Sequence, residues 1–274
     1  VSSMERYQKC EKNCEAIGMK TESYLGKIWT IMEIELRRIR HDYTDLITRS
    51  IQPILWLVVF GSVFEKFRIL PTGSYSYMQF IAPGILGQSV LFISIFFGLS
   101  LVWDRESGLL SKLMVSPAPA FTIALGKALA AGVRGLTQAV VILVIVFAIG
   151  IPLTTNPIYI LGIIPVVILL AGSFASLSMI IASIVKSRER FMGIGQLLTM
   201  PLFFTSNALY PISVMPVWLQ VIAYVNPLSY GIDALRSLLL TGNMNGIWLN
   251  FLVLIATLLI LSFIAGKVLK GIME

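Results

Sequence analysis

The sequence predicts an all-α integral membrane protein with six transmembrane helices, an N-terminal amphipathic interfacial helix, and outer re-entrant helices between the fifth and sixth spans. Three observations predict this fold class. Hydrophobic residues make up 57% of the 274 residues, and the mean hydropathy is +0.85. Charged residues make up only 13%, against about 25% in soluble domains. Eighteen of the 21 positive residues fall in alternate connections, and the positive-inside rule assigns these to the cytoplasm. We therefore expect an inner cell membrane protein with both termini cytoplasmic.

The first 46 residues precede the apolar part of the chain. Residues 1–23 form a polar tail, in which Cys10 and Cys14 have neither zinc-pair nor redox-pair spacing and are expected to be reduced cytosolic thiols. In residues 24–46, apolar side chains recur at steps of three and four, and basic residues fall largely opposite. This pattern predicts an amphipathic helix in the membrane interface. A soluble helix packed on a partner is the alternative.

Six apolar segments follow, and each is predicted to cross the membrane. About 20 helical residues cross a hydrocarbon core of about 30 Å. The spans are expected at about 47–64, 80–103, 121–151, 159–185, 191–210 and 247–269. Pro165 and Pro201 lie inside spans, where neighbouring helices can tolerate the kinks that they cause.

The third span carries two positive charges. Lys127 and Arg134 are seven residues apart and so share a helix face. A charge at the bilayer centre costs about 2.5–3.5 kcal/mol on insertion scales. Either the lower part of this helix extends into the cytoplasm or snorkels its charges to the inner headgroups, or the two residues line a polar path for an anionic headgroup. Ala124, Ala128 and Gly132 suit close helix packing.

The connection 211–246 is apolar although the topology places it outside. Asn226 and Pro227 interrupt it, and Asp233 and Arg236 follow, three residues apart and so able to pair. We expect two short helices that dip into the outer leaflet, one on each side of Asn226–Pro227. A seventh span is the alternative, but it would place the carboxyl terminus outside, against the charge bias.

No catalytic or metal-binding motif is evident. The sequence has no GxxxxGK[ST], HExxH or GxSxG pattern, and His41 is a lone histidine that is expected to be solvated. The chain is therefore predicted to be no enzyme, with no cofactor, no metal site and no nucleic-acid partner. An ion-driven carrier usually has acidic residues deep in its spans, and the apolar centres here have none. This absence favours an external source of energy.

Two segments resemble a known family. Residues 104–117, DRESGLLSKLMVSP, are similar to the "RE.G.l..l..sP" segment of ABC-2 type transporter permeases. Residues 226–236, NPLSYGIDALR, are similar to that family's "NP..y..da.R" block. The resemblance covers roughly residues 27–269 and is closest to the drug-resistance and lipid or glycoconjugate export branch. Only the tail before Lys20 departs from the pattern.

The resemblance implies a half-transporter without its own ATPase. Such a permease moves an amphipathic substrate (a drug, a lipid or a lipid-linked glycan) outward. A second permease, either an identical copy in a homodimer or a homologue, and two cytosolic ATP-binding cassette subunits would complete it. ATP and Mg would bind those subunits, and membrane lipids would surround the spans. An ion-driven secondary carrier is the alternative, and a membrane-embedded enzyme or assembly subunit is the third hypothesis.

The segment 104–116 is the expected coupling helix. It lies at the tip of a hairpin between two spans, and the resemblance implies that it rests in a groove of the ATPase, which the amphipathic start also touches. A solvated loop is the alternative. The residues expected to couple are Asp104, Arg105, Glu106, Leu109, Leu110, Lys112 and Leu113.

Aromatic side chains recur on three spans. Such stripes usually pack or contact lipid, but in the family the corresponding helices one, two and five line the transport route. The resulting substrate-path candidates are Trp56, Phe60, Phe92, Phe96, Phe203 and Phe204.

Overall fold

The computed structural model describes residues 43–67, 75–108, 119–154, 156–185, 187–242, 244 and 246–271, with isolated positions at 26, 29, 32 and 33. These residues form helices and connections, and no strand occurs among them. Four helices are long and apolar enough to cross a membrane, and they correspond to the second, third, fourth and sixth predicted spans. They are α5 (Tyr77–Glu106), α7 (Ala120–Ala148), α8 (Pro157–Ile184) and α12 (Ile247–Gly271).

Helix starts follow local capping chemistry. Before α5, the Ser76 hydroxyl accepts a hydrogen bond from the Gln79 amide, and the Gln79 side chain accepts one from the Ser76 amide. Before α8, the Asn156 side chain accepts a hydrogen bond from the Ile158 amide, and Pro157 occupies the first helical position. These caps fix the starts of two of the four long helices.

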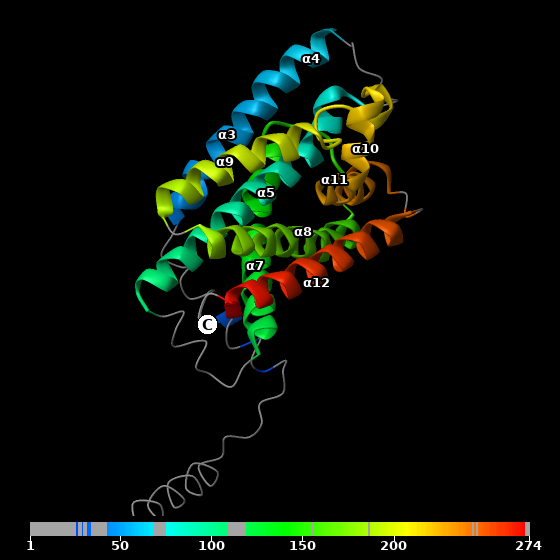
Figure 1. Cartoon of the computed structure of the whole chain (residues 1–274). Coiled ribbons are helices and arrows are strands. Elements are labelled where there is room, and N and C mark those ends of the chain that lie inside the picture. The colour runs from blue at the N-terminus through cyan, green and yellow to red at the C-terminus, as the bar shows by residue number, and fades with distance from the viewer. Residues whose placement is uncertain are drawn as a thin grey trace, which may run out of the picture.

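Of the four long helices, α8 lies at the centre and contacts the other three, α5, α7 and α12 (Figure 1). Small residues allow close approach: a Cβ at Gly172 would lie 3.3 Å from the Ala128 carbonyl oxygen, and one at Gly132 would lie 2.9 Å from the Ile168 side chain. Hydroxyls link neighbouring helices, as between Ser176 of α8 and Ser262 of α12 at 2.9 Å. Small-residue contacts and buried hydroxyl bonds are typical of helix packing within membranes.

The first predicted span belongs to one continuous helical segment made of α3 (Tyr43–Leu55), the π-helical turn η1 (Trp56–Phe60) and α4 (Gly61–Phe67). Its apolar part covers Ser50–Phe64 and is shorter than the four long helices. The helix begins at Tyr43, so no break separates it from the last residues of the expected interfacial helix. The rest of that expected helix lies outside the described residues, apart from the isolated positions.

The fifth predicted span corresponds to α9 (Arg188–Phe204), which ends six residues before the predicted boundary. Pro201 lies in its last turn, where the Thr205 amide closes on the Pro201 carbonyl at 2.9 Å. The chain then turns onto α5, because Gly84 leaves room for the backbone of Ala208; a Cβ there would lie 2.8 Å from the Ala208 Cα. This close approach fixes the path of the chain just after α9.

Between α9 and α12 the described chain forms only short elements. They are η2 (Ile212–Val214), α10 (Val217–Val225), α11 (Pro227–Arg236) and η3 (Ser237–Thr241). Helices α10 and α11 meet at Asn226, where a helix break was predicted. No helix in this described stretch is as long as the four membrane-length helices, so the seventh span that was weighed as an alternative has no counterpart of that length here.

Candidate functional site

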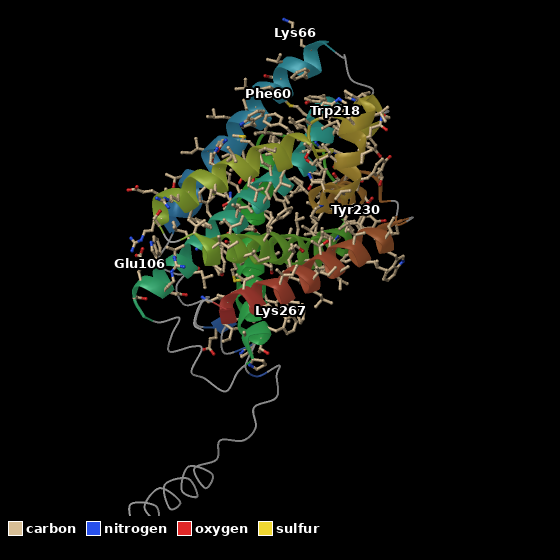
Figure 2. All side chains as sticks on the ribbon, in the orientation of Figure 1. Phe60, Lys66, Glu106, Trp218, Tyr230 and Lys267 are labelled. Atoms are coloured by element: carbon tan, nitrogen blue, oxygen red, sulfur yellow. The ribbon has the colours of Figure 1, made fainter. Side chains whose placement is uncertain are left out.

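The described polar groups of most interest gather at two separate places. Figure 2 shows Glu106 at one end of the helix bundle, and Trp218 and Tyr230 towards the other. At the Glu106 end, the Lys127 Nζ of α7 donates a hydrogen bond to the Asp104 Oδ2 of α5 at 2.6 Å. The Lys127 side chain is 1% exposed and that of Asp104 is 2% exposed. Two helices that flank the expected coupling segment are thus joined by a buried ion pair.

This pair excludes two of the expectations for the Lys127 side chain. The side chain neither snorkels to a surface nor lines an open polar path, because it is buried and its charge is matched by Asp104. The pair also sets Asp104 apart from the other expected coupling residues. Its carboxylate points to α7 instead of standing on the bundle surface.

The next two residues bind the end of α5 to the link between α8 and α9. The Arg105 Nη2 donates a hydrogen bond to the Val185 carbonyl at 2.8 Å. The exposed side chain of Glu106 pairs with Arg188, whose guanidinium lies 5.6 Å from the Trp103 ring centroid. The expected coupling residues Leu109, Leu110, Lys112 and Leu113 lie outside the described residues.

Four of the six substrate-path candidates form one aromatic cluster. The Trp56 and Phe60 rings of η1 stack with centroids 4.4 Å apart. Trp56 also meets Phe203 edge-on at 5.9 Å and Phe204 at 5.7 Å, so η1 and the end of α9 lie side by side. Phe203 is buried and Phe204 is 39% exposed. The cluster packs two helices together and exposes one ring at its rim.

The other two candidates lie apart from that cluster. Phe92 and Phe96 of α5 contact each other with centroids 4.7 Å apart, and both are half-buried. They lie beside α9 at Gly195, where a Cβ would lie 3.8 Å from the Phe96 ring. The structure therefore divides the six aromatic residues into a four-ring cluster and a two-ring pair.

At the other end, Arg236 is held on three sides. Its Nη1 donates to the Asp233 Oδ1 at 3.3 Å, which confirms the pairing expected from their spacing. Its Nη2 donates to the Asn207 carbonyl at 2.9 Å, and its guanidinium lies 3.9 Å from the Phe80 ring centroid. Burial lowers the pKa of Arg236 to about 10 and Asp233 opposes that shift, so the guanidinium stays charged at neutral pH.

Asn226 connects two helices across the break in the chain. Its Oδ1 accepts a hydrogen bond from the Leu228 amide at 3.0 Å, which caps α11. Its Nδ2 donates to the Leu202 carbonyl at 2.7 Å and the Thr205 Oγ1 at 3.2 Å, satisfying groups at the end of α9. Pro227 takes the first position of α11. Sequence reasoning singled out Asn226 and Pro227 but missed this connection, and it missed Asn207 entirely.

The described residues contain no cluster of three or more His, Cys, Asp or Glu side chains that could hold a metal ion. What they contain is a membrane-type helix bundle with charged contacts at each end. Comparison with known families matches residues 26–240 to the ABC-2 type transporter family. The chain belongs to this family.

Relatives of this ABC-2 transporter chain are named as permeases. It is 34% identical over 218 residues to the putative transport permease ycf38 of Cyanophora paradoxa, covering 78% of this chain and 74% of the relative. It is 24% identical over 200 residues to the daunorubicin resistance ABC transporter permease protein DrrB1 of Streptomyces coeruleorubidus, covering 73% and 70%. It is 28% identical over 168 residues to the probable multidrug ABC transporter permease YbhR of Escherichia coli K12, covering 60% and 44%.

Family membership assigns the chain the character of an ABC transporter membrane subunit. The matched region includes both motifs singled out in the sequence, and it includes α5 through α11. Both charged ends therefore lie largely within the part that defines the ABC-2 family.

Proposed function

We propose that this ABC-2 permease is the membrane subunit of an exporter that moves an amphipathic substrate outward with ATP hydrolysed by a separate subunit. The observation that carries the proposal is the charged end of α5, whose three consecutive residues contact α7, the end of α8 and the start of α9. A transporter driven from outside the membrane needs such a place, where force on one segment reaches several helices.

The contacts at this end define how such a force would spread. A push on the turn at Glu106 would reach α7 through the buried Asp104–Lys127 pair. It would reach the α8–α9 link through Arg105 and Arg188. The coupling surface itself would then consist of Arg105, Glu106 and the following leucine-rich segment, with Asp104 as a positioning residue behind it.

The partners follow from this mode of driving. Two cytosolic ATP-binding cassette subunits would bind ATP and Mg, and a second permease copy, most simply an identical one, would complete the membrane part. Two of the relatives are named as a multidrug permease and a daunorubicin resistance permease, which supports an amphipathic substrate. A drug, a lipid or a lipid-linked glycan would meet that description.

In the proposed orientation the Glu106 end faces the cytoplasm and both termini lie there. The segment α3–η1–α4 and α9 would then complete the six spans, and α10 and α11 would dip into the outer leaflet. Single cysteines at positions 72 and 243 should label from outside, whereas cysteines at 111 and 187 should label only after permeabilisation. Labelling of position 243 from inside would contradict the six-span topology.

The function is tested with the purified permease and a candidate ATP-binding cassette subunit, reconstituted together in vesicles. We expect the two to co-purify, and we expect uptake of some amphipathic compounds from a panel to require ATP. An ATPase variant without its catalytic base serves as the matched control, and an ionophore should leave uptake unchanged. Uptake that needs an ion gradient but no ATP would overturn the proposal in favour of a secondary carrier.

A further inference from the structure

A hollow of about 350 Å³ opens beside the Arg236 end of the bundle. Its lining comes from α11, η3, Gly246 and the first turn of α12. The lining residues are Asp233, Arg236, Ser237, Thr241, Gly246, Leu249 and Asn250. Its volume is within the range of small-molecule sites, at about 300–1,000 Å³, and five of its seven lining residues have polar side chains.

Two polar groups in this hollow have hydrogen-bonding capacity left over. The Asp233 side chain is 44% exposed, and both of its hydrogen bonds, from Asn207 and Arg236, go to Oδ1. The other carboxylate oxygen, Oδ2, accepts no hydrogen bond from the described residues. The side-chain amide of Asn250 likewise has no hydrogen-bond partner in the described part of the chain. An unused anionic acceptor therefore faces the same space as an amide donor and the Arg236 guanidinium.

The position of the hollow along α12 fixes its depth in a membrane. Helix α12 has 25 residues, so it is about 37 Å long against a hydrocarbon core of about 30 Å. A helix of this length that is centred on the core would place its first turn, which holds Leu249 and Asn250, at the level of the lipid headgroups. Trp248 is 81% exposed beside it and Trp218 of α10 is 66% exposed, as expected of tryptophans in an interfacial aromatic belt.

We propose that this hollow binds the headgroup of a zwitterionic phospholipid that carries a primary amine. The ammonium would donate hydrogen bonds to the free oxygen of Asp233, and the phosphate would accept them from Arg236 and Asn250. A primary ammonium has three N–H donors, whereas a trimethylated amine has none, so the carboxylate favours the former. A purely anionic headgroup would place like charge beside Asp233.

The surroundings indicate a membrane lipid instead of a soluble zwitterion. Leu249 on the rim is 59% exposed, and Leu252 one turn further along α12 is 65% exposed. These side chains continue the polar hollow into an apolar helix face, along which an acyl chain can lie. The site is separate from the coupling end and does not depend on the proposed transport function.

The test measures lipid binding to the purified full-length permease by native mass spectrometry. Phosphatidylethanolamine, phosphatidylcholine and phosphatidylglycerol with identical acyl chains are supplied in equal amounts. We expect the parent protein to retain phosphatidylethanolamine preferentially. Asp233→Asn should lower that preference about tenfold, as expected for loss of a hydrogen bond between charged groups, while its amide oxygen still accepts from Asn207 and Arg236.

Asn250→Leu provides a second variant, because the Asn250 side chain has no partner in the described fold whose loss would unfold the protein. It should weaken binding of all three lipids. Gln196→Leu, at an exposed position of α9 away from the hollow, is the matched control and should bind as the parent does. Equal retention of the three lipids by the parent, or unchanged binding in both pocket variants, would overturn the proposal. So would phosphoethanolamine that binds as tightly as the lipid, since it lacks acyl chains.

Discussion

The charged end of α5 and the charged end of α11 each carry an acid–base pair, but the two pairs connect different things. Asp104 and Lys127 belong to two helices and are 23 residues apart, with exposures of 2% and 1%. Asp233 and Arg236 lie on one short helix, with exposures of 44% and 15%. The first pair joins two separate long helices. The second stiffens a short helix and, through Asn207, holds it to the end of α9.

The difference in burial sets the difference in cost when a partner is lost. Removing one member of a buried pair leaves an uncompensated charge and costs about 3–5 kcal/mol. An exposed or partly exposed pair is worth about 0–1 kcal/mol. The variants below test this contrast between the two ends, beginning with the largest expected effect.

Lys127→Met should be the most damaging change. It takes the Lys127 ammonium away from the buried Asp104 carboxylate, so we expect a loss of about 3–5 kcal/mol of folding free energy and little folded permease. The double variant Lys127→Met with Asp104→Leu removes both charges and should recover most of the loss. Thermal stability and folded yield in detergent are the measurements. A double variant as unstable as the single one would show that the pair is not what holds these helices.

Glu106→Ala and Leu110→Asp should affect function more than folding. The Glu106–Arg188 pair is exposed, so its loss should cost less than about 1 kcal/mol. We expect normal insertion, reduced transport and ATP hydrolysis that is uncoupled from transport, measured in purified complexes beside co-purification of the ATPase. Glu189→Ala is the matched control, because Glu189 is an exposed carboxylate next to Arg188 in the chain. Normal transport by both test variants would move energy entry elsewhere.

Asn226→Ala should have an intermediate effect on stability at the opposite end. It removes the α11 cap and the side-chain amide that donates to the Leu202 carbonyl and the Thr205 hydroxyl at the end of α9, for an expected loss of about 1–3 kcal/mol. Asn156→Ala removes an exposed cap of α8 and should cost about 1 kcal/mol. Melting temperatures of the two variants, measured side by side, give the comparison. Equal losses would mean that Asn226 acts as a cap alone.

Phe60→Ala and Phe96→Ala should change substrate preference with the least effect on assembly. Both side chains are half-buried and lie in different aromatic groups. We therefore expect each replacement to leave the packing of the buried core intact. Transport of a compound panel by each variant, normalised to permease content, is the measurement. If every compound is transported as by the parent, the aromatic residues serve packing only.

The features that sequence predicted well depend on local information. Four long spans follow from length and lack of charge, and the Asp233–Arg236 pair follows from a spacing of three on one helix. The predicted span ends six residues beyond α9. Those six residues turn onto α5, where Ala208 approaches Gly84, and this contact joins residues that are far apart in sequence.

The partners of the site residues could not be predicted in the same way. Asp104 and Lys127 pair only because α5 and α7 are neighbours in the bundle, which no residue pattern in either helix specifies. The same holds for Trp56 with Phe203, and for Asn226 with Leu202. Sequence located these residues as candidates, but the tertiary packing decides which of them meet.

The π-helical turn at Trp56–Phe60 has a consequence for how the first helix tolerates changes in length. A π turn closes hydrogen bonds from each residue to the fifth one back and holds about one residue more than an α turn. Deleting a single residue such as Val59 would convert the turn to regular α-helix and leave the hydrogen bonding on both sides complete. Elsewhere in this helix the same deletion would rotate everything beyond it by about 100°, since each residue turns an α-helix by that amount. Five residues of η1 thus form the one described stretch of this helix where the chain can shorten by a residue and keep Phe64 on its present face.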